Sequence, residues 1–138
     1  MVYQERVERA TSGHGDMHDI SQDVFRIVGS SQITTGIVNV HVVGSTAAIA
    51  TIEFEPGLQR DLPEILDKLM PPGRHYGHEQ AWHDGNAHSH LQATTLGPSL
   101  SVPVGGGSPI LGTWQQIILL ECDVKARQRE IVVTVTGG

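Results

Sequence analysis

The chain is organised around residues 75–116, which read HYGHEQAWHDGNAHSHLQATTLGPSLSVPVGGGSPILGTWQQ. Five of its eight histidines fall within residues 75–90. Imidazole side chains bind metal ions and move protons near neutral pH, and they rarely crowd in this way only to support a fold. We therefore expect the functional site of the protein in this stretch.

The length and composition of the chain limit the kind of fold it can form. Its 138 residues are enough for one domain with a core of its own, so we expect a single domain over residues 1–138. Only 38% of the residues are hydrophobic, and 16 are glycine. This composition indicates many turns, and either a small core or burial against partner subunits.

Charge and hydropathy exclude several classes of protein. The formal net charge of −6 argues against a broad surface for nucleic acid. Cys122 is the single cysteine, which rules out an internal disulfide and suits a reducing compartment. No apolar run approaches the roughly 20 residues of a membrane span, and the start of the chain lacks the apolar centre of a signal peptide. We expect a cytoplasmic protein that binds neither nucleic acid nor membranes.

Apolar residues that alternate with polar ones indicate β-strands along most of the chain. The predicted strands are residues 2–10, 36–43, 48–54, 90–96, 100–104, 116–123 and 130–136. Three consecutive glycines at residues 105–107 indicate a turn that closes a hairpin. The charged residues 125–129 are expected to form a solvated turn before the last strand.

Two segments carry the signals of helices. Residues 21–29 have apolar side chains on one face, and Ser21 is the expected cap. In residues 62–70 the apolar side chains follow helical spacing, with Asp61 and Glu64 as a capping pair. Strands with two separated helices predict an α+β fold, mostly antiparallel, built as a sheet or a sandwich.

The histidines suggest a metal site. His88 and His90 are two residues apart at the mouth of a predicted strand, so both side chains would project from the same face. His78 could supply a third imidazole, and three nitrogen ligands plus water form an open site for a divalent metal such as zinc. The ion would lower the pKa of the bound water to near 7. The alternative is that these histidines belong to a solvated loop.

Carboxylates are expected beside such a metal. Glu53 and Glu55 lie on the same side of an extended chain, and either could be a fourth ligand, an orienting group or a general base. Asp84 could orient an imidazole, or it could simply belong to the turn that it forms with Gly85 and Asn86. These sequence patterns do not rank the three acids.

Other residues could bind the organic part of a ligand or its phosphate. Ser45, Thr46 and the backbone amides around Gly44 could cradle an anion such as phosphate. Trp82 and Trp114 are the only tryptophans, and either could pack against an aromatic ring of a ligand. For Trp114 we prefer the interpretation that it anchors the core. No nucleophile elbow is present, and Cys122 lies in an apolar strand, so serine and cysteine nucleophiles are set aside.

The chain resembles the YjbQ family (UPF0047), also called the secondary thiamine-phosphate synthase family. The resemblance rests on Asn86 to His90, on Gly-Pro-Ser-Leu-Ser-Val-Pro at residues 97–103, and on Leu-Gly-Thr-Trp-Gln at residues 111–115. It extends over about residues 36–137. The resemblance implies an α+β fold assembled as a homotrimer and a metal site built from histidines. It also implies a weak or secondary ability to join a pyrimidine diphosphate to a thiazole phosphate.

The chain departs from the family pattern at three places. The family's His-Thr-Thr-Ala motif aligns with residues 44–47, Gly-Ser-Thr-Ala, so its histidine is absent here. The acidic motif keeps Glu53 and Glu55 but has Pro56 in place of the next aspartate. His88 stands where many relatives have proline. The site could have kept its number of ligands while the metal moved, or it could have lost the chemistry of the family.

The family's other histidines are retained. Its tyrosine-x-histidine element matches residues 76–78, and the histidine that ends its Asn-Ala-Pro-Ala-His element matches His90. From these matches we expect a metal-dependent enzyme acting on a phosphorylated small molecule, in which the ion neutralises a departing pyrophosphate and Trp82 or Trp114 packs on the pyrimidine. One alternative is a metal-assisted hydrolase in which Glu55 activates the metal-bound water. The other is a non-catalytic, metal-stabilised trimer that binds a ligand.

Overall fold

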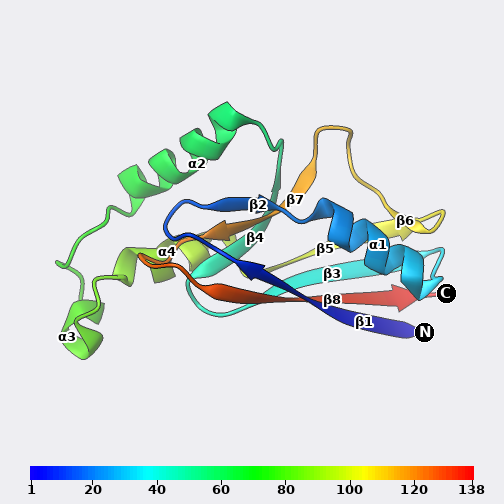
Figure 1. Cartoon of the computed structure of the whole chain (residues 1–138), viewed down its shortest axis with the longest axis horizontal. Helices are drawn as coiled ribbons and strands as arrows, with labels where there is room; N and C mark the ends of the chain where they lie inside the picture. Colours follow the sequence, from blue (N-terminus) through cyan, green and yellow to red (C-terminus); the bar gives the residue numbers. More distant parts are fainter.

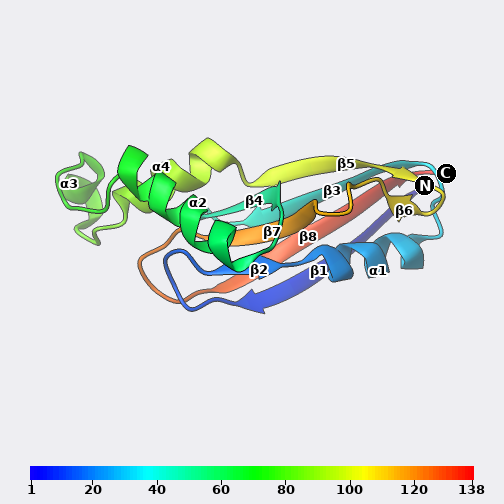
Figure 2. The same ribbon diagram turned by 90° about the horizontal axis from the view of Figure 1, so that it is seen from above.

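Two antiparallel sheets and four helices form the fold (Figures 1 and 2). The structure, a computed structural model, describes all residues from Met1 to Gly138. The strands are β1 (Val2–Ala10), β2 (Met17–Asp19), β3 (Gly36–Val43), β4 (Ala47–Ile52), β5 (Ser99–Gly105), β6 (Ser108–Pro109), β7 (Gln116–Glu121) and β8 (Gln128–Gly137). The helices are α1 (Ser21–Ser31), α2 (Pro56–Leu69), α3 (His78–Trp82) and α4 (Ala87–Leu96). None of the four is long and apolar enough to cross a bilayer.

The larger sheet has the strand order β1-β8-β3-β5-β6, and the smaller sheet has the order β2-β7-β4. Every neighbouring pair is antiparallel. The expected α+β fold with mostly antiparallel strands is therefore confirmed, although four helices form where two were expected. The glycines at residues 105–107 make the turn between β5 and β6, as the sequence indicated.

The main core lies between the two sheets and is closed by α1. Alternate side chains of a strand point to opposite faces, so each long strand of the larger sheet contributes every second residue. The buried residues of this core include Val38, Val40 and Val42 of β3, Val102 and Val104 of β5, Ile117 and Leu119 of β7, Ile131, Val133 and Val135 of β8, and Val24, Ile27 and Val28 of α1.

Strand β7 is covered on both faces. Ile117 and Leu119 enter the main core, whereas Ile118 and Leu120 point the other way into a second, smaller core. Met17, Leu66 of α2 and Ala93 of α4 complete that second core. Two covered faces explain why this strand is apolar throughout, where the edge strand β1 alternates.

Residues 90–96 were predicted to be a strand, and the structure corrects this to part of helix α4. Ala, Leu and Gln favour a helix, and the inward residues Ser89, Gln92 and Ala93 recur at helical spacing. The helix ends at Gly97, which has a positive φ of 98°. Because the segment is short and weakly amphipathic, its apolar residues did not distinguish strand from helix.

The two predicted helices exist, but their first turns differ from the prediction. Helix α2 begins at Pro56, six residues before the predicted start, and Glu55 caps it by accepting from the backbone N–H groups of Gly57 (2.9 Å) and Leu58 (2.5 Å). Asp61 and Glu64 are thus not its capping pair. Ser21 does not cap α1 either, because its hydroxyl accepts a hydrogen bond from the backbone N–H of Ile117.

The histidine-rich segment lies at one end of the elongated molecule and both termini lie at the other (Figure 1). Helix α3 projects beyond the ends of the sheets, and α4 returns the chain toward β5 (Figures 1 and 2). The β3–β4 turn and the β7–β8 loop reach the same end as α4. The fold thereby brings together three segments that are far apart in sequence.

Candidate functional site

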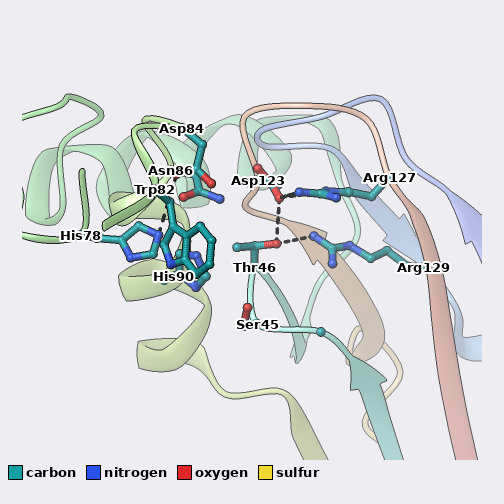
Figure 3. A pocket seen from close by; sticks show the side chains of 11 residues that line it. Ser45, Thr46, His78, Trp82, Asp84, Asn86, His90, Asp123, Arg127 and Arg129 are labelled. Atoms are coloured by element: carbon teal, nitrogen blue, oxygen red, sulfur yellow. Dashed lines mark hydrogen bonds and ion pairs between the residues drawn. The ribbon is translucent and has the colours of Figure 1, made fainter. Parts of the chain in front are cut away.

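A pocket of about 410 Å³ opens where these three segments meet (Figure 3). The β3–β4 turn, the β7–β8 loop with the start of β8, and the α3–α4 segment each supply part of its lining. The lining residues are Gly44, Ser45, Thr46, His78, Trp82, Asp84, Asn86, His90, Asp123, Arg127 and Arg129. Ten of the eleven are polar or glycine, so the pocket suits a polar or charged ligand.

A buried ion pair forms one side of this pocket. Arg129 faces inward at the start of β8, in phase with Ile131, and is only 6% exposed. Its Nε donates to Oε1 of Glu121 (2.8 Å) and its Nη2 donates to Oε2 of the same carboxylate. Glu121 is fully buried at the end of β7 and also accepts from the hydroxyl of Thr11 (2.6 Å). A charged group at this depth is stable only with such partners.

The Glu121 pair leaves one edge of the Arg129 guanidinium free. Nη2 donates a further bond to the hydroxyl of Thr46 (2.8 Å), whereas Nη1 makes no hydrogen bond. Nη1 lies beside Gly44, where a Cβ would stand only 2.8 Å from it. Gly44 also has a φ of +141°, which a residue with a side chain rarely adopts. Glycine at this position therefore keeps the free N–H groups of Arg129 open to the pocket.

Arg127 and Asp123 form a second ion pair beside the first. Nε of Arg127 donates to Oδ2 of Asp123 (2.9 Å), and the hydroxyl of Thr46 donates to the same oxygen (3.0 Å), as Figure 3 shows. Burial by itself would raise the pKa of Asp123, but the hydrogen bonds from Arg127 and Thr46 outweigh it and lower the pKa below 3.8. Asp123 is therefore a carboxylate at neutral pH and holds Arg127 at the pocket.

Two histidines face the pocket from the opposite side. The rings of His78 and His90 meet edge to face with centroids 4.6 Å apart, and Nε2 of His78 is 3.8 Å from Oδ1 of Asp84. Burial and then the neighbouring His78 lower the pKa of His90 below 6.5. His90 is therefore a neutral imidazole near pH 7, the form in which a histidine can act as a base.

Asn86 adds an unsatisfied acceptor to the same pocket. Its side chain is buried, lines the pocket, and has an Oδ1 without a hydrogen-bond partner. A buried polar atom without a partner is destabilising unless a ligand or solvent satisfies it. This residue therefore supports a ligand that carries a donor as well as acceptors.

The three-histidine metal site is not formed as the sequence predicted. His88 and His90 lie on helix α4, where residues two apart point about 200° away from each other, and not on a strand. His90 faces His78 in this pocket, whereas His88 packs against His14 on the other face of the helix. No group of three or more His, Cys, Asp or Glu side chains in the chain has a geometry that could hold a metal ion.

The other predicted site residues divide into two groups. Ser45, Thr46 and Asp84 line the pocket with the histidines. Glu53 and Glu55 line a separate depression of about 270 Å³, and the carboxylate of Glu55 is engaged in capping α2. Trp114 belongs to this depression too. It is 71% exposed, so the preferred interpretation of Trp114 as a core anchor is wrong.

Sequence reasoning missed the arginines of the site. Residues 125–129 were expected to be a solvated turn, but Arg127 and Arg129 line the pocket. The strand alternation offered a signal, since Arg129 is in phase with the buried Ile131 and Val133. Glu121 gave the same signal, since it is in phase with the buried Ile117 and Leu119. Two opposite charges at inward positions of neighbouring sheets indicate a buried pair.

Comparisons with known proteins agree with the fold. A family model described as "UPF0047 protein YjbQ-like" matches residues 5–138. A UPF0047 protein of Methanothermobacter thermautotrophicus is 41% identical over 136 residues, which cover 99% of this chain and 93% of the relative. One of Archaeoglobus fulgidus is 41% identical over 122 residues, covering 88% and 93%.

Solved structures give the same result. The crystal structure of a YbjQ-like protein of unknown function from Sulfolobus solfataricus superposes with a TM-score of 0.94 at 37% identity, covering 100% of this chain and 99% of that one. The structure of a hypothetical protein from Aeropyrum pernix gives a TM-score of 0.86 at 32% identity, with coverage of 97% and 99%.

Proposed function

The chain belongs to the family of YjbQ-like UPF0047 proteins, and from this premise we propose that its arginine-lined pocket binds the phosphate group of a small molecule. The observation that carries the proposal is the free Nη1 of Arg129. Its guanidinium is fixed by Glu121 and Thr46, so its open edge is already oriented for an oxyanion and loses little freedom when it binds. Arg127, Ser45 and the backbone next to Gly44 add donors around the same space.

The proposed reaction is a transfer of the thiamine-phosphate synthase type. The bond between the pyrimidine-bearing carbon and a diphosphate would break, its electrons leaving with pyrophosphate, while the thiazole nitrogen forms the new bond to that carbon. The two arginines would stabilise the charge that develops on the pyrophosphate. His78 and His90 would exchange protons with the phosphate oxygens, and Asp84 lies beside His78.

The homotrimer remains a proposal, supported by surfaces that one copy leaves open. Ile65 and Leu69 are exposed on α2, and Trp114 is exposed beside the acidic depression that contains Glu53 and Glu55. A contact between copies would bury these exposed apolar side chains. Light scattering should give the mass of three chains, and Leu69→Ser should lower it. A monomeric mass for the unchanged chain would exclude the trimer.

A divalent metal ion does not fit one chain by itself. An open catalytic zinc site has three protein ligands, whereas this pocket offers only the two imidazoles of His78 and His90. We keep a zinc-type ion as a proposal for the trimer only, with the missing ligand supplied by a neighbouring copy. Metal analysis of the purified trimer tests this, since His78→Ala and His90→Ala should each remove the ion. A full complement of ion in both variants would exclude these ligands.

Calorimetric titration with pyrophosphate tests the phosphate site. Arg129→Lys keeps the positive charge but loses the paired N–H geometry, and we expect the affinity to fall roughly tenfold or more. Lys125→Ala, a charge removed from the same loop outside the pocket, is the matched control and should leave the affinity unchanged. Equal affinity for the unchanged chain and Arg129→Lys would refute the proposal.

Turnover separates transfer from hydrolysis. The chain is supplied with the pyrimidine diphosphate with or without the thiazole phosphate, and pyrophosphate release is measured. Release that requires the thiazole supports transfer, whereas equal release without it supports the metal-assisted hydrolase. Binding of pyrophosphate without any turnover supports the non-catalytic binding protein.

A further inference from the structure

A second pocket, of about 400 Å³, lies on the opposite side of the α3–α4 segment from the arginine-lined pocket. His14, Arg74 and His88 line it together with parts of two glycine-containing turns, and Asp84 borders both pockets. None of its three basic side chains has a role in the proposed function. His88 is one of the three predicted metal ligands, and it points away from the other two, His78 and His90.

His88 is a buried polar group without partners. Its side chain is 2% exposed, and neither ring nitrogen makes a hydrogen bond. His88 lines the second pocket, and of its two ring nitrogens only Nδ1 is fully sealed from the surface. Buried imidazoles in folded proteins normally have at least one partner. Nε2 is therefore the atom of His88 that a molecule in this pocket would reach.

Arg74 offers free donors above the same pocket. Its Nη1 donates to Oε1 of Glu79 and to the backbone carbonyl of His83 (2.9 Å), but its Nε and Nη2 make no hydrogen bond. The guanidinium lies over Gly85, where a Cβ would come within 3.1 Å of Nη2 and where φ is +66°. Glycine at residue 85 thus leaves room for the open edge of Arg74, as Gly44 does for Arg129.

The ring of His14 forms part of the floor. Its Nδ1 is 2.9 Å from the carbonyl oxygen of Cys122 and its Nε2 is 2.7 Å from Oδ1 of Asp67. Both of its ring nitrogens therefore already have partners within the chain. The His14 ring meets that of His88 at a centroid distance of 5.3 Å. Asp84, the one acid on the rim, is within 3.8 Å of His78 on the other side.

We propose that this second pocket binds a small oxyanion, a carboxylate or a phosphate, between Nε2 of His88 and the free edge of Arg74. The anion would accept from both groups and would lie near the ring of His14. The site is separate from the pocket of the proposed function, because the lining residues of the two have only Asp84 in common. The proposal stands whether or not Arg129 binds phosphate.

The test uses the full chain labelled with ¹⁵N in its histidine rings. Long-range ¹H–¹⁵N spectra are recorded while inorganic phosphate is added, and acetate is added in a second series. We expect the Nε2 signal of His88 to shift and saturate with at least one of the two anions, and the anion that binds more tightly identifies the class. Unchanged His88 signals in both series overturn the proposal.

Two variants separate this site from the first. Arg74→Gln, at an exposed side chain, should weaken the His88 response roughly tenfold or more while leaving pyrophosphate binding at the first pocket intact. Arg129→Lys should leave the His88 response unchanged. A His88 response that disappears in Arg129→Lys would show that it came from the first pocket and would overturn the second site. If the unchanged chain shows the His88 response but does not bind pyrophosphate, only the proposed function is refuted.

Discussion

The two sides of the arginine-lined pocket are built in opposite ways. On the side formed by the sheets, Glu121, Arg129 and Thr46 are buried and joined by hydrogen bonds. On the side formed by α3 and the following turn, Trp82 is 72% exposed and Asp84 is exposed as well, with one long contact to His78. The first side is fixed by the fold, and the second is attached to it through a few loop residues.

This difference indicates that the two sides of the pocket are suited to different roles. Buried charges with many partners can hold an anion in one orientation, because their own positions are already determined. Exposed groups on a short helix can approach or leave a substrate and can also contact another copy of the chain. Substitutions on the sheet side should therefore affect folding and binding together, whereas those on the α3 side should affect function with little effect on folding.

The largest effect is expected from Glu121→Ala. It leaves the buried Arg129 charge without its carboxylate, and we expect the free energy of unfolding to fall by about 3–5 kcal/mol. Urea denaturation measures it. Glu53→Ala removes an acid that makes no hydrogen bond through its side chain, and should change stability by no more than about 0.5 kcal/mol. Similar losses in both variants would contradict the stabilising role of the buried pair between Glu121 and Arg129.

The double variant Glu121→Leu with Arg129→Met sharpens this result. Apolar side chains of similar size often replace a buried ion pair without loss of stability. We therefore expect urea denaturation to show that most of the lost stability returns, and titration to show that pyrophosphate no longer binds. A double variant that still binds pyrophosphate would show that Arg129 serves only the fold.

Thr46→Val should have the next largest effect. The change keeps the shape of the side chain but removes the hydroxyl that accepts from Arg129 and donates to Asp123, at a cost of about 1–3 kcal/mol. The matched control is Thr94→Val on the exposed face of α4, which should stay within about 0.5 kcal/mol. Thermal or urea unfolding distinguishes the two. Equal effects would mean that the hydroxyl of Thr46 contributes nothing specific.

The pH dependence of stability should reflect His88 and His90. Burial, aided by His14 for His88 and by His78 for His90, lowers both pKa values from 6.5, so the unfolded chain binds more protons than the folded chain just below that pH. The contribution of these two histidines to the free energy of unfolding is fully present above about pH 6.5. It is lost as the pH falls toward their pKa values in the folded chain. Urea midpoints across this range should decrease less steeply in His88→Gln. A slope identical to that of the unchanged chain would exclude His88 as a contributor.

The smallest effect on stability is expected from Trp82→Ala. The indole is largely exposed, so the free energy of unfolding should stay within about 0.5 kcal/mol of its original value. Its role would instead show as weaker binding of a pyrimidine-containing ligand, with the affinity for pyrophosphate unchanged. A large loss of stability would show that the indole of Trp82 is packed and not solvent-exposed.

Most of the sheet structure could be predicted from the sequence, because apolar and polar residues alternate along a strand that is buried on one face. β1 and β3 match the predicted residues 2–10 and 36–43, since one face of each strand is clearly more apolar. The start of α2 and the nature of α4 were missed for local reasons. Glu55 caps α2 just before Pro56, outside the apolar residues whose spacing predicted this helix. Helix α4 presents polar side chains to the interior, so it lacks the usual apolar stripe.

The candidate site was predicted in part, and the reason lies in the geometry of helix α4. The histidines were noticed, but whether His88 and His90 share a face depends entirely on whether the segment is a strand or a helix. Arg129 was missed because its burial depends on Glu121, a residue from the other sheet. Alternation places each of these two residues at an inward position of its strand, but it does not pair them until the two sheets are known to face each other.

The adjacency of the two chain ends determines how the molecule should respond to mechanical pulling. Val2 pairs with Thr136, and the amino group of Met1 donates to the carbonyl of Gly137, so β1 and β8 begin and end side by side (Figure 1). Tension applied between the ends acts along the hydrogen bonds of this pair, which run perpendicular to the strands. The bonds would then break one after another, like a zipper, and not together in shear. Strand β1 should peel away at low force, while the sheets that carry the two pockets stay folded until later.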